Sequence, residues 1–194
     1  MSIVIAYANM NRVIIKCDGR ECDVTTNKVV SEDTLKIWEV GKNCLIGYTG
    51  IKQYCEKAIE LFEQEIKMKN PFLCIKVFQK ILQILYNFQP FKAYFIITGN
   101  FNGRIVLWHL SSDDIFKNIG DKSPSIENPN TYVVIGSDEI SQAIYFEHIY
   151  DNKLTPENNM NNYIRYISTI SQSVNDHITT KKLEYNNMVL KIIK

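Results

Sequence analysis

The chain opens with two short apolar segments that a polar turn separates. Residues 3–8 (IVIAYA) and 12–18 (RVIIKCD) are rich in β-branched and aromatic side chains, and Asn9-Met10-Asn11 lies between them. Such runs, divided by turn residues, predict a β-hairpin. Both faces of each predicted strand are apolar, which is typical of a sheet that is covered on both sides.

The same pattern recurs further along the chain and predicts more strands. Residues 34–40 and 43–49 form one pair around a glycine-containing turn, and residues 93–99 and 104–110 form another. Between residues 111 and 130 the chain is polar with two prolines, so we expect a long loop. Single strands are predicted at residues 131–137 (TYVVIGS) and 185–193 (YNNMVLKII).

Two predicted helices follow the second strand pair. Residues 51–68 place their apolar side chains on one face at helical spacing. A second helix begins at Pro71 and runs to Phe88. It is apolar around much of its circumference, so we expect it to be packed on two sides. Three of its apolar residues have two possible roles, either contacts between copies of the chain or part of the core. They are Phe78, Ile81 and Tyr86.

Two more helices are predicted in the last third of the chain. One covers residues 139–150 and directly follows a strand. The other follows a polar loop at 151–161 and carries an apolar face of Tyr163, Ile167, Ile170, Val174 and Ile178. Strand pairs alternating with helix pairs favour layered antiparallel sheets over a repeated β-α-β unit. The predicted fold is therefore α+β, a four-layer αββα sandwich, in one domain over residues 1–194.

Composition and charge narrow the function classes. Hydrophobic residues make up 45% and charged residues 22%, as expected for a globular domain, and the formal net charge is only +1. This balance gives no electrostatic footprint for nucleic acid or for an acidic membrane surface. The sequence has no apolar run long enough for a membrane span and no recognisable signal peptide. We therefore expect a cytoplasmic protein.

The cysteines and histidines do not suggest a metal site or a conventional triad. The five cysteines are odd in number and lack metal-knuckle spacing, so reduced thiols in the core are expected. The three histidines are scattered along the chain, which gives little support to a Ser-His-Asp arrangement.

Several segments together resemble a known family. The opening SIVIAYANMNRVIIKCDG is similar to the start of proteasome β-subunits and of the HslV-type peptidase, with an Asp sixteen residues after the hydroxyl residue. The stretch NKVVSEDTLKIWEVGKNCLIGYTG is similar to the family segment with a catalytic Lys and a glycine turn. FIITGN and VVIGS resemble two later segments. The resemblance extends over essentially the whole chain and implies an N-terminal-nucleophile hydrolase.

The resemblance implies a catalytic role for four early residues. Ser2 becomes the nucleophile once Met1 is removed, which generally requires a small second residue. Its own α-amine, with an ordinary pKa of about 7.7–8, then takes the hydroxyl proton. Lys36 is the neighbouring cation, Asp18 its partner, and the Gly50 N–H the donor to the oxyanion.

Later residues complete the implied site. Ser137 matches a family serine near the terminal amine, and Asp176 with Thr179 matches a pair that belongs to the same cluster. Backbone bends of this kind bind a cation in several relatives, so Ser173, Asp176 and Thr179 are candidate ligands of Na⁺ or Mg²⁺. No cofactor is expected to be required. By position, Tyr48 and Lys52 are expected to line the pocket for the substrate side chain.

Each of these residues also has an ordinary structural explanation, and three functions stay open. Asp18 before Gly19 is a common strand end, and Asp176 and Thr179 are common capping groups. The favoured function is cleavage of peptides or unfolded proteins by a ring-shaped homo-oligomer, with a possible AAA+ unfoldase as partner. The alternatives are a non-catalytic assembly subunit that keeps Met1 and an amidase of the same superfamily acting on a small amide.

Overall fold

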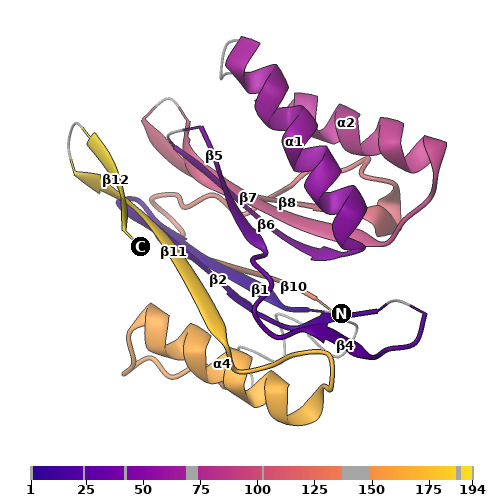
Figure 1. Ribbon diagram of the computed structural model, residues 1–194. Coiled ribbons are helices and arrows are strands. Elements are labelled where there is room, and N and C mark those ends of the chain that lie inside the picture. The colour runs from indigo at the N-terminus through magenta and orange to yellow at the C-terminus, as the bar shows by residue number, and fades with distance from the viewer. Residues whose placement is uncertain are drawn as a thin grey trace.

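Two antiparallel five-stranded sheets form the centre of the molecule (Figure 1). The computed structural model describes residues 2–23, 25–41, 43–68, 74–101, 103–136, 149–186 and 189–193. The first sheet has the order β10-β1-β2-β11-β12, comprising β1 (Val4–Asn9), β2 (Arg12–Asp18), β10 (Asn130–Ile135), β11 (Ile178–Asn186) and β12 (Val189–Ile193). The second has the order β5-β6-β7-β8-β9, comprising β5 (Ile37–Val40), β6 (Cys44–Gly50), β7 (Ala93–Phe101), β8 (Arg104–Ser111) and β9 (Gly120–Asp121).

Helices cover the outer faces of both sheets (Figure 1). Helices α1 (Lys52–Met68) and α2 (Cys74–Phe88) pack on the second sheet, and α4 (Pro156–Ile170) packs on the first. A separate apolar cluster joins the inner faces of the two sheets and includes Val4, Ile15, Leu45 and Ile96. The molecule is thus a four-layer αββα sandwich, which confirms the predicted fold class. Each sheet packs against helices on one face and against the other sheet on the opposite face, which explains why the strands are apolar on both faces.

Three apolar residues of α2 lie in the core or pack against it. Phe78 is fully buried between α1 and the second sheet, with its ring 4.9 Å from that of Phe62 and 5.2 Å from that of Phe95. Ile81 and Tyr86 pack against the same cluster. The sequence left open whether these residues contact another copy of the chain or belong to the core; Phe78 belongs to the core, and Ile81 and Tyr86 are partly buried against it. The exposed apolar side chains of α2 are Ile84 and Phe88 instead.

Some predicted boundaries and elements were wrong. The predicted loop at 111–130 contains the short 3₁₀ helix η2 (Ser112–Asp114) and β9. The predicted polar loop at 151–161 is shorter, because Thr155 caps α4 by accepting from the Asn158 N–H, and Pro156 starts the helix. The strands of the small hairpin β3 (Glu21–Cys22) and β4 (Val29–Ser31) are too short to leave a sequence pattern.

The largest error concerns β11. Val174 and Ile178 were predicted on a helical face, but α4 ends at Ile170, and Ile178 is the first residue of a strand. Polar residues occupy half-buried positions of β11, where Lys181 pairs with Glu39 and Lys182 pairs with Glu157. Ion pairs therefore hold this strand in place of the apolar alternation that sequence analysis looks for.

Two further observations bear on the expectations from sequence. The predicted helix at 139–150 falls almost entirely outside the described residues. Of the helices that the structure does describe, none combines the length and the apolar character that crossing a membrane would require.

Candidate active site

The pairing of β1 with β2 brings the start of the chain beside Asp18. The two strands are antiparallel, with Val4 opposite Cys17, and the Asp18 N–H donates to the Ile3 carbonyl at 3.3 Å. Ser2 and Asp18 are both buried, with exposed fractions of 8% and 0%. A spacing of sixteen residues in sequence therefore becomes direct proximity through the hairpin.

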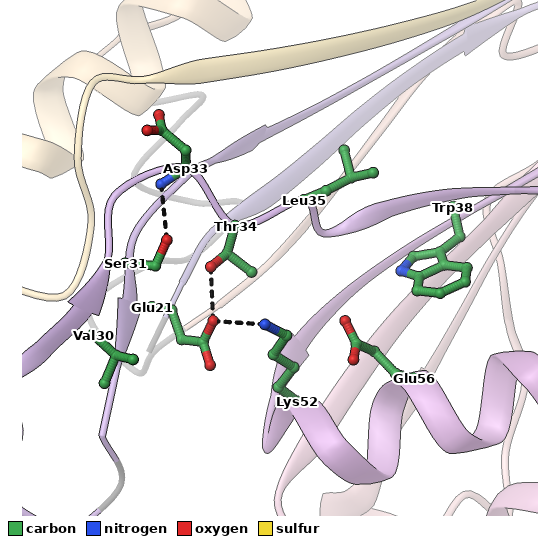
Figure 2. A pocket seen from close by; sticks show the side chains of 9 residues that line it. All are labelled: Glu21, Val30, Ser31, Asp33, Thr34, Leu35, Trp38, Lys52 and Glu56. Carbon is green, nitrogen blue, oxygen red and sulfur yellow. Dashed lines mark hydrogen bonds and ion pairs between the residues drawn. The ribbon is translucent and has the colours of Figure 1, made fainter.

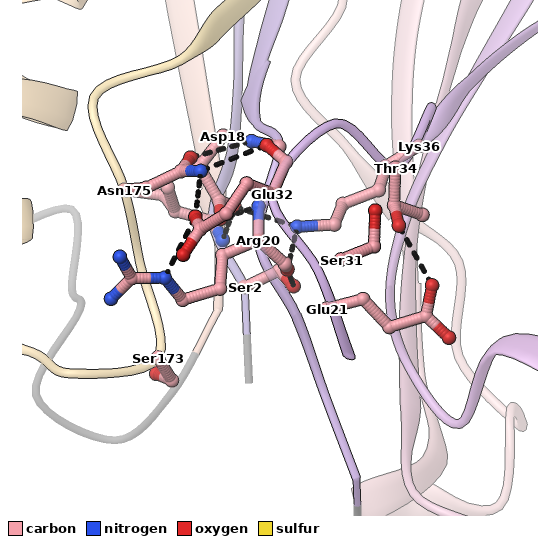
Figure 3. A network of polar contacts seen from close by, with 12 residues as sticks. Ser2, Asp18, Arg20, Glu21, Ser31, Glu32, Thr34, Lys36, Ser173 and Asn175 are labelled. Atoms are coloured by element: carbon pink, nitrogen blue, oxygen red, sulfur yellow. Dashed lines mark hydrogen bonds and ion pairs between the residues drawn. The ribbon is translucent and has the colours of Figure 1, made fainter. Parts of the chain in front are cut away.

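The Asp18 carboxylate is the centre of a buried polar cluster (Figure 3). Its Oδ1 accepts from Lys36 Nζ at 3.0 Å and from the Ile3 N–H at 2.8 Å, and its Oδ2 accepts from the Arg20 N–H at 2.9 Å. Burial is the largest influence on the Asp18 carboxyl and raises its pKa, whereas the Lys36 ammonium and the two N–H donors act in the opposite direction. The lysine and the aspartate are each other's charged partner, with side chains only 4% and 0% exposed.

Ser2 and Lys36 meet at one backbone oxygen. The Arg20 carbonyl accepts from Ser2 Oγ at 3.2 Å and from Lys36 Nζ at 2.5 Å, so the hydroxyl and the ammonium are neighbours (Figure 3). The structure thus brings together Ser2, Asp18 and Lys36 at one end of the two sheets. Arg20 was not predicted from sequence, and since its contribution is a carbonyl, no side-chain pattern signals it.

Lys36 is held in place on its backbone side as well. It precedes β5, and its carbonyl accepts from the Tyr48 N–H of β6 at 3.1 Å. The buried Cys17 thiol accepts from the Lys36 backbone N–H. Burial raises the pKa of that thiol to about 12, so Cys17 stays protonated and is a packing residue, not a rival nucleophile.

Gly50 ends β6, immediately before α1, and its place in the fold requires glycine. Its φ is +121°, and an added Cβ would lie 2.3 Å from the Lys92 carbonyl oxygen of the neighbouring chain segment. The Ile51 N–H donates to that same oxygen. Because N–H groups alternate along a strand, the Gly50 N–H is expected on the edge where the Tyr48 N–H meets Lys36. The role of this N–H as an oxyanion donor stays a prediction.

A second group of residues fixes the Asp18–Arg20 turn from outside. Asn175 Oδ1 accepts from the Gly19 N–H at 2.9 Å, and Asn175 Nδ2 donates to the Glu32 carbonyl at 2.9 Å. Glu32 in turn accepts from Arg20 Nε at 3.1 Å. Sequence analysis missed Asn175 because one asparagine in a polar stretch carries no signal of its own.

The remaining predicted site residues have varied environments. Asp176 is exposed, and Thr179 lies on β11 opposite Cys17, whose thiol it contacts. It is the neighbouring Asn175, not Asp176, that contacts the Asp18–Arg20 turn. Ser173 Oγ lies 2.9 Å from Ser171 Oγ. Ser137 lies outside the described residues, and the cation site at Ser173, Asp176 and Thr179 stays a prediction.

A cavity of about 470 Å³ opens beside this cluster (Figure 2). Glu21, Thr34 and Lys52 line it, and their side chains are joined: Glu21 Oε2 accepts from Thr34 Oγ1 at 2.7 Å and from Lys52 Nζ at 2.9 Å. The predicted pocket residue Lys52 is therefore in the cavity wall. Tyr48 is buried behind the wall and donates its hydroxyl to Glu56, which does line the cavity.

The four layers have the proteasome-like N-terminal-nucleophile hydrolase fold, as two similar solved structures show. Eukaryotic HslV from Trypanosoma brucei superposes with a TM-score of 0.71 at 15% identity, covering 94% of this chain and 99% of that one. An Anbu (Gly-1) mutant from Hyphomicrobium sp. strain MC1 superposes with a TM-score of 0.74 at 12% identity, covering 100% and 85%. No protein-family model and no curated protein sequence matches the chain. At such identities the likeness establishes the fold and leaves the activity to be argued from the residues.

Proposed function

We propose that this protein, after removal of Met1, hydrolyses peptide bonds with Ser2 as its nucleophile. The observation that carries the proposal is the shared contact of Ser2 Oγ and Lys36 Nζ with the Arg20 carbonyl, next to the buried Asp18. A hydroxyl next to an ammonium has a lowered proton affinity, which makes it a better nucleophile. The fold shared with HslV supports the same conclusion.

The reaction follows from these groups. The Ser2 α-amine, free once Met1 has gone, takes the hydroxyl proton while Oγ bonds to the substrate carbonyl carbon. The Gly50 N–H and the Lys36 ammonium stabilise the negative charge that develops on the carbonyl oxygen. The C–N bond breaks, and the amine passes its proton to the leaving nitrogen. Water then cleaves the Ser2 ester, returning the hydroxyl and releasing the acid.

Assembly and partners belong to the same proposal. By resemblance, the chain forms a ring-shaped homo-oligomer in the cytoplasm, encloses its sites and receives peptides or unfolded proteins, with an AAA+ unfoldase delivering them. A structural cation, Na⁺ or Mg²⁺, bound near Ser173, Asp176 and Thr179 would order the bend before β11. Oxygen ligands of that kind suit a hard cation.

The decisive experiment combines intact mass with peptide cleavage. We expect the mass of the protein from its native host to be one methionine lower than that of the encoded chain. We expect Ser2→Ala to lower kcat/KM on peptides by at least about a thousandfold, and Ser2→Thr to retain activity. Ser125→Ala is the matched control, since Ser125 is an exposed loop serine.

The outcomes separate the three functions. Retention of Met1 in active preparations, or undiminished cleavage by Ser2→Ala, contradicts the mechanism. Retained Met1 with no hydrolysis of any amide supports a non-catalytic assembly subunit. Ser2-dependent hydrolysis restricted to small amides supports the amidase.

A further inference from the structure

The cavity beside Ser2 carries an uneven distribution of charge that points to one kind of substrate. We infer that it accepts a cationic side chain, lysine or arginine, of the residue next to the bond that is cleaved. The inference rests on the proposed function for the position of that bond. Its chemical basis is the set of side chains in the cavity wall.

The cavity and the reactive groups share the same short segments. Glu21 directly follows Arg20, whose carbonyl binds both Ser2 Oγ and Lys36 Nζ. Thr34 lies two residues before Lys36 and contacts Glu21 at 2.7 Å. Figure 3 shows Glu21, Thr34 and Ser31, all of which line the cavity, beside Ser2 and Lys36. Because Glu21 and Thr34 of the cavity wall lie one and two residues from Arg20 and Lys36, we place in this cavity the side chain next to a peptide carbonyl bound at Ser2.

Carboxylates outnumber cations among the residues of the wall. Among the described residues of the wall, Glu21, Asp33 and Glu56 carry carboxylates, and Lys52 is the only lysine or arginine. The bond to Glu21 raises the pKa of Lys52, so this ammonium stays charged and its charge is matched by Glu21. Asp33 is 85% exposed at the rim, where it contacts His177. Glu56 is left as a half-buried carboxylate of the wall that forms no ion pair among the described residues, although the charge of Lys52 also interacts with it.

Glu56 is presented to the cavity by a neutral donor. Its Oε1 accepts from the Tyr48 hydroxyl at 3.1 Å, and burial raises the pKa of that tyrosine, which therefore stays a donor. The second Glu56 oxygen accepts no hydrogen bond within the described part of the chain. Figure 2 shows this carboxylate between Lys52 and the indole of Trp38. An incoming ammonium or guanidinium would complete its bonding.

The rest of the wall suits the aliphatic part of a long basic side chain. Val30 and Leu35 line the cavity and are 64% and 49% exposed, and Trp38 adds an aromatic surface. Lysine and arginine bury their methylene groups on such surfaces and keep the charged end beside a polar partner. An acidic substrate side chain would meet Glu56 instead, and a purely apolar one would leave that carboxylate desolvated and unpaired.

The first test measures cleavage selectivity in the mature full-length protein. The substrates are peptides that differ only in the residue before the reporter group. That residue is lysine, arginine, norleucine or glutamate. We expect lysine and arginine to be cleaved at least about tenfold better than norleucine, the size expected for one charge-assisted hydrogen bond. Glu56→Gln is expected to remove this preference by lowering the cleavage of lysine and arginine peptides and raising that of the norleucine peptide, because an apolar side chain then no longer desolvates a carboxylate. Glu60→Gln, one turn further along the exposed side of α1, is the matched control.

The second test measures binding without catalysis, so that the two proposals fail separately. The Ser2→Ala variant is titrated with an acetylated tripeptide amide that ends in lysine or in norleucine. Isothermal titration calorimetry measures the dissociation constant of each peptide. Tighter binding of the lysine peptide that Glu56→Gln abolishes supports the inference even if no peptide is hydrolysed. Equal binding of both peptides, or cleavage that favours norleucine or glutamate, overturns it even where Ser2-dependent hydrolysis stands.

Discussion

The buried pair of Asp18 and Lys36 is the residue-scale feature on which the site depends. We expect Lys36→Met to lower the free energy of unfolding by about 3–5 kcal/mol, because it leaves a buried carboxylate without its cation. The double variant with Asp18→Asn should lose less than the sum of the two single changes. Urea unfolding of the four proteins measures this coupling.

A matched control separates a buried pair from an exposed one. Lys57 and Glu60 form a pair at 3.7 Å whose side chains are 55% and 51% exposed. Lys57→Met should therefore change stability by no more than about 1 kcal/mol. Equal losses for Lys36→Met and Lys57→Met would contradict the role given to the Asp18 cluster.

Gly50 offers a second test at the same scale. Gly50→Ala should cost about 3–4 kcal/mol of stability, since a clash with the Lys92 carbonyl adds to the strain of a positive φ. Gly41→Ala is the control, because Gly41 has a φ of +62° and open space around it, and it should lose only about 1 kcal/mol. Thermal unfolding measures the stability of both variants. A similar loss of stability in both would show that the Lys92 carbonyl moves aside at little cost.

The sequence predicted the side chains of this cluster but not the backbone groups that join them. Ser2, Asp18 and Lys36 were predicted from the resemblance of their segments to the family, and the structure places them in contact through Arg20. The Arg20 carbonyl and Asn175 were missed, since a carbonyl has no sequence signature and Asn175 acts through the backbone of Gly19. The roles of Asp176, Thr179 and Ser137 stay predictions.

At the scale of the elements, α4 is tied to β11 by an ion pair that titrates. Glu157 accepts from Lys182 at 2.7 Å, and this bond lowers the pKa of the Glu157 carboxyl. A lowered pKa means that the pair stabilises the fold above the ordinary glutamate pKa of about 4.3. The contribution is lost as the pH falls through the lower pKa of the folded state.

Glu157→Gln measures this contribution. At pH 7 the variant should be less stable than the parent by about 0.5 kcal/mol, the size of a half-exposed ion pair. The difference should shrink as the pH is lowered below 4, which urea unfolding at a series of pH values records. A difference that stays constant down to pH 3 would mean that the side chain acts through packing alone.

The same ion pairs explain which elements the sequence could predict. Strands β1, β2, β6, β7 and β8 were predicted because they are buried on both faces by apolar neighbours. In β11, Lys181 and Lys182 are satisfied by Glu39 and Glu157, partners that lie far away in sequence. A local pattern carries no trace of such long-range partners, so the start of the strand at Ile178 was assigned to a helix and only its last residues, 185–186, fell within a predicted strand.

At the scale of the whole molecule, the order of the elements was enough to predict the layers. Hairpins followed by helix pairs can bury both faces of each strand only if two sheets pack between outer helices. The three apolar clusters observed between successive layers are the physical result. What the order of elements could not predict was which apolar side chains of α2 face outward.

Those outward side chains carry the last prediction, which concerns assembly. Ile84 and Phe88 are four residues apart on α2 and are 59% and 88% exposed, so they form one apolar patch on the outer helical layer. We expect this patch to be buried between copies of the chain in the proposed ring. The double variant Ile84→Ser, Phe88→Ser should then shift the mass in solution toward that of one chain, as light scattering on a sizing column measures.

Ile126→Ser is the control, because Ile126 is 93% exposed but isolated in a loop, and isolated exposed apolar residues are common. A double variant that keeps the mass of the parent assembly would place the ring contacts on another face, and a parent that is itself a single chain would remove the ring from the proposal.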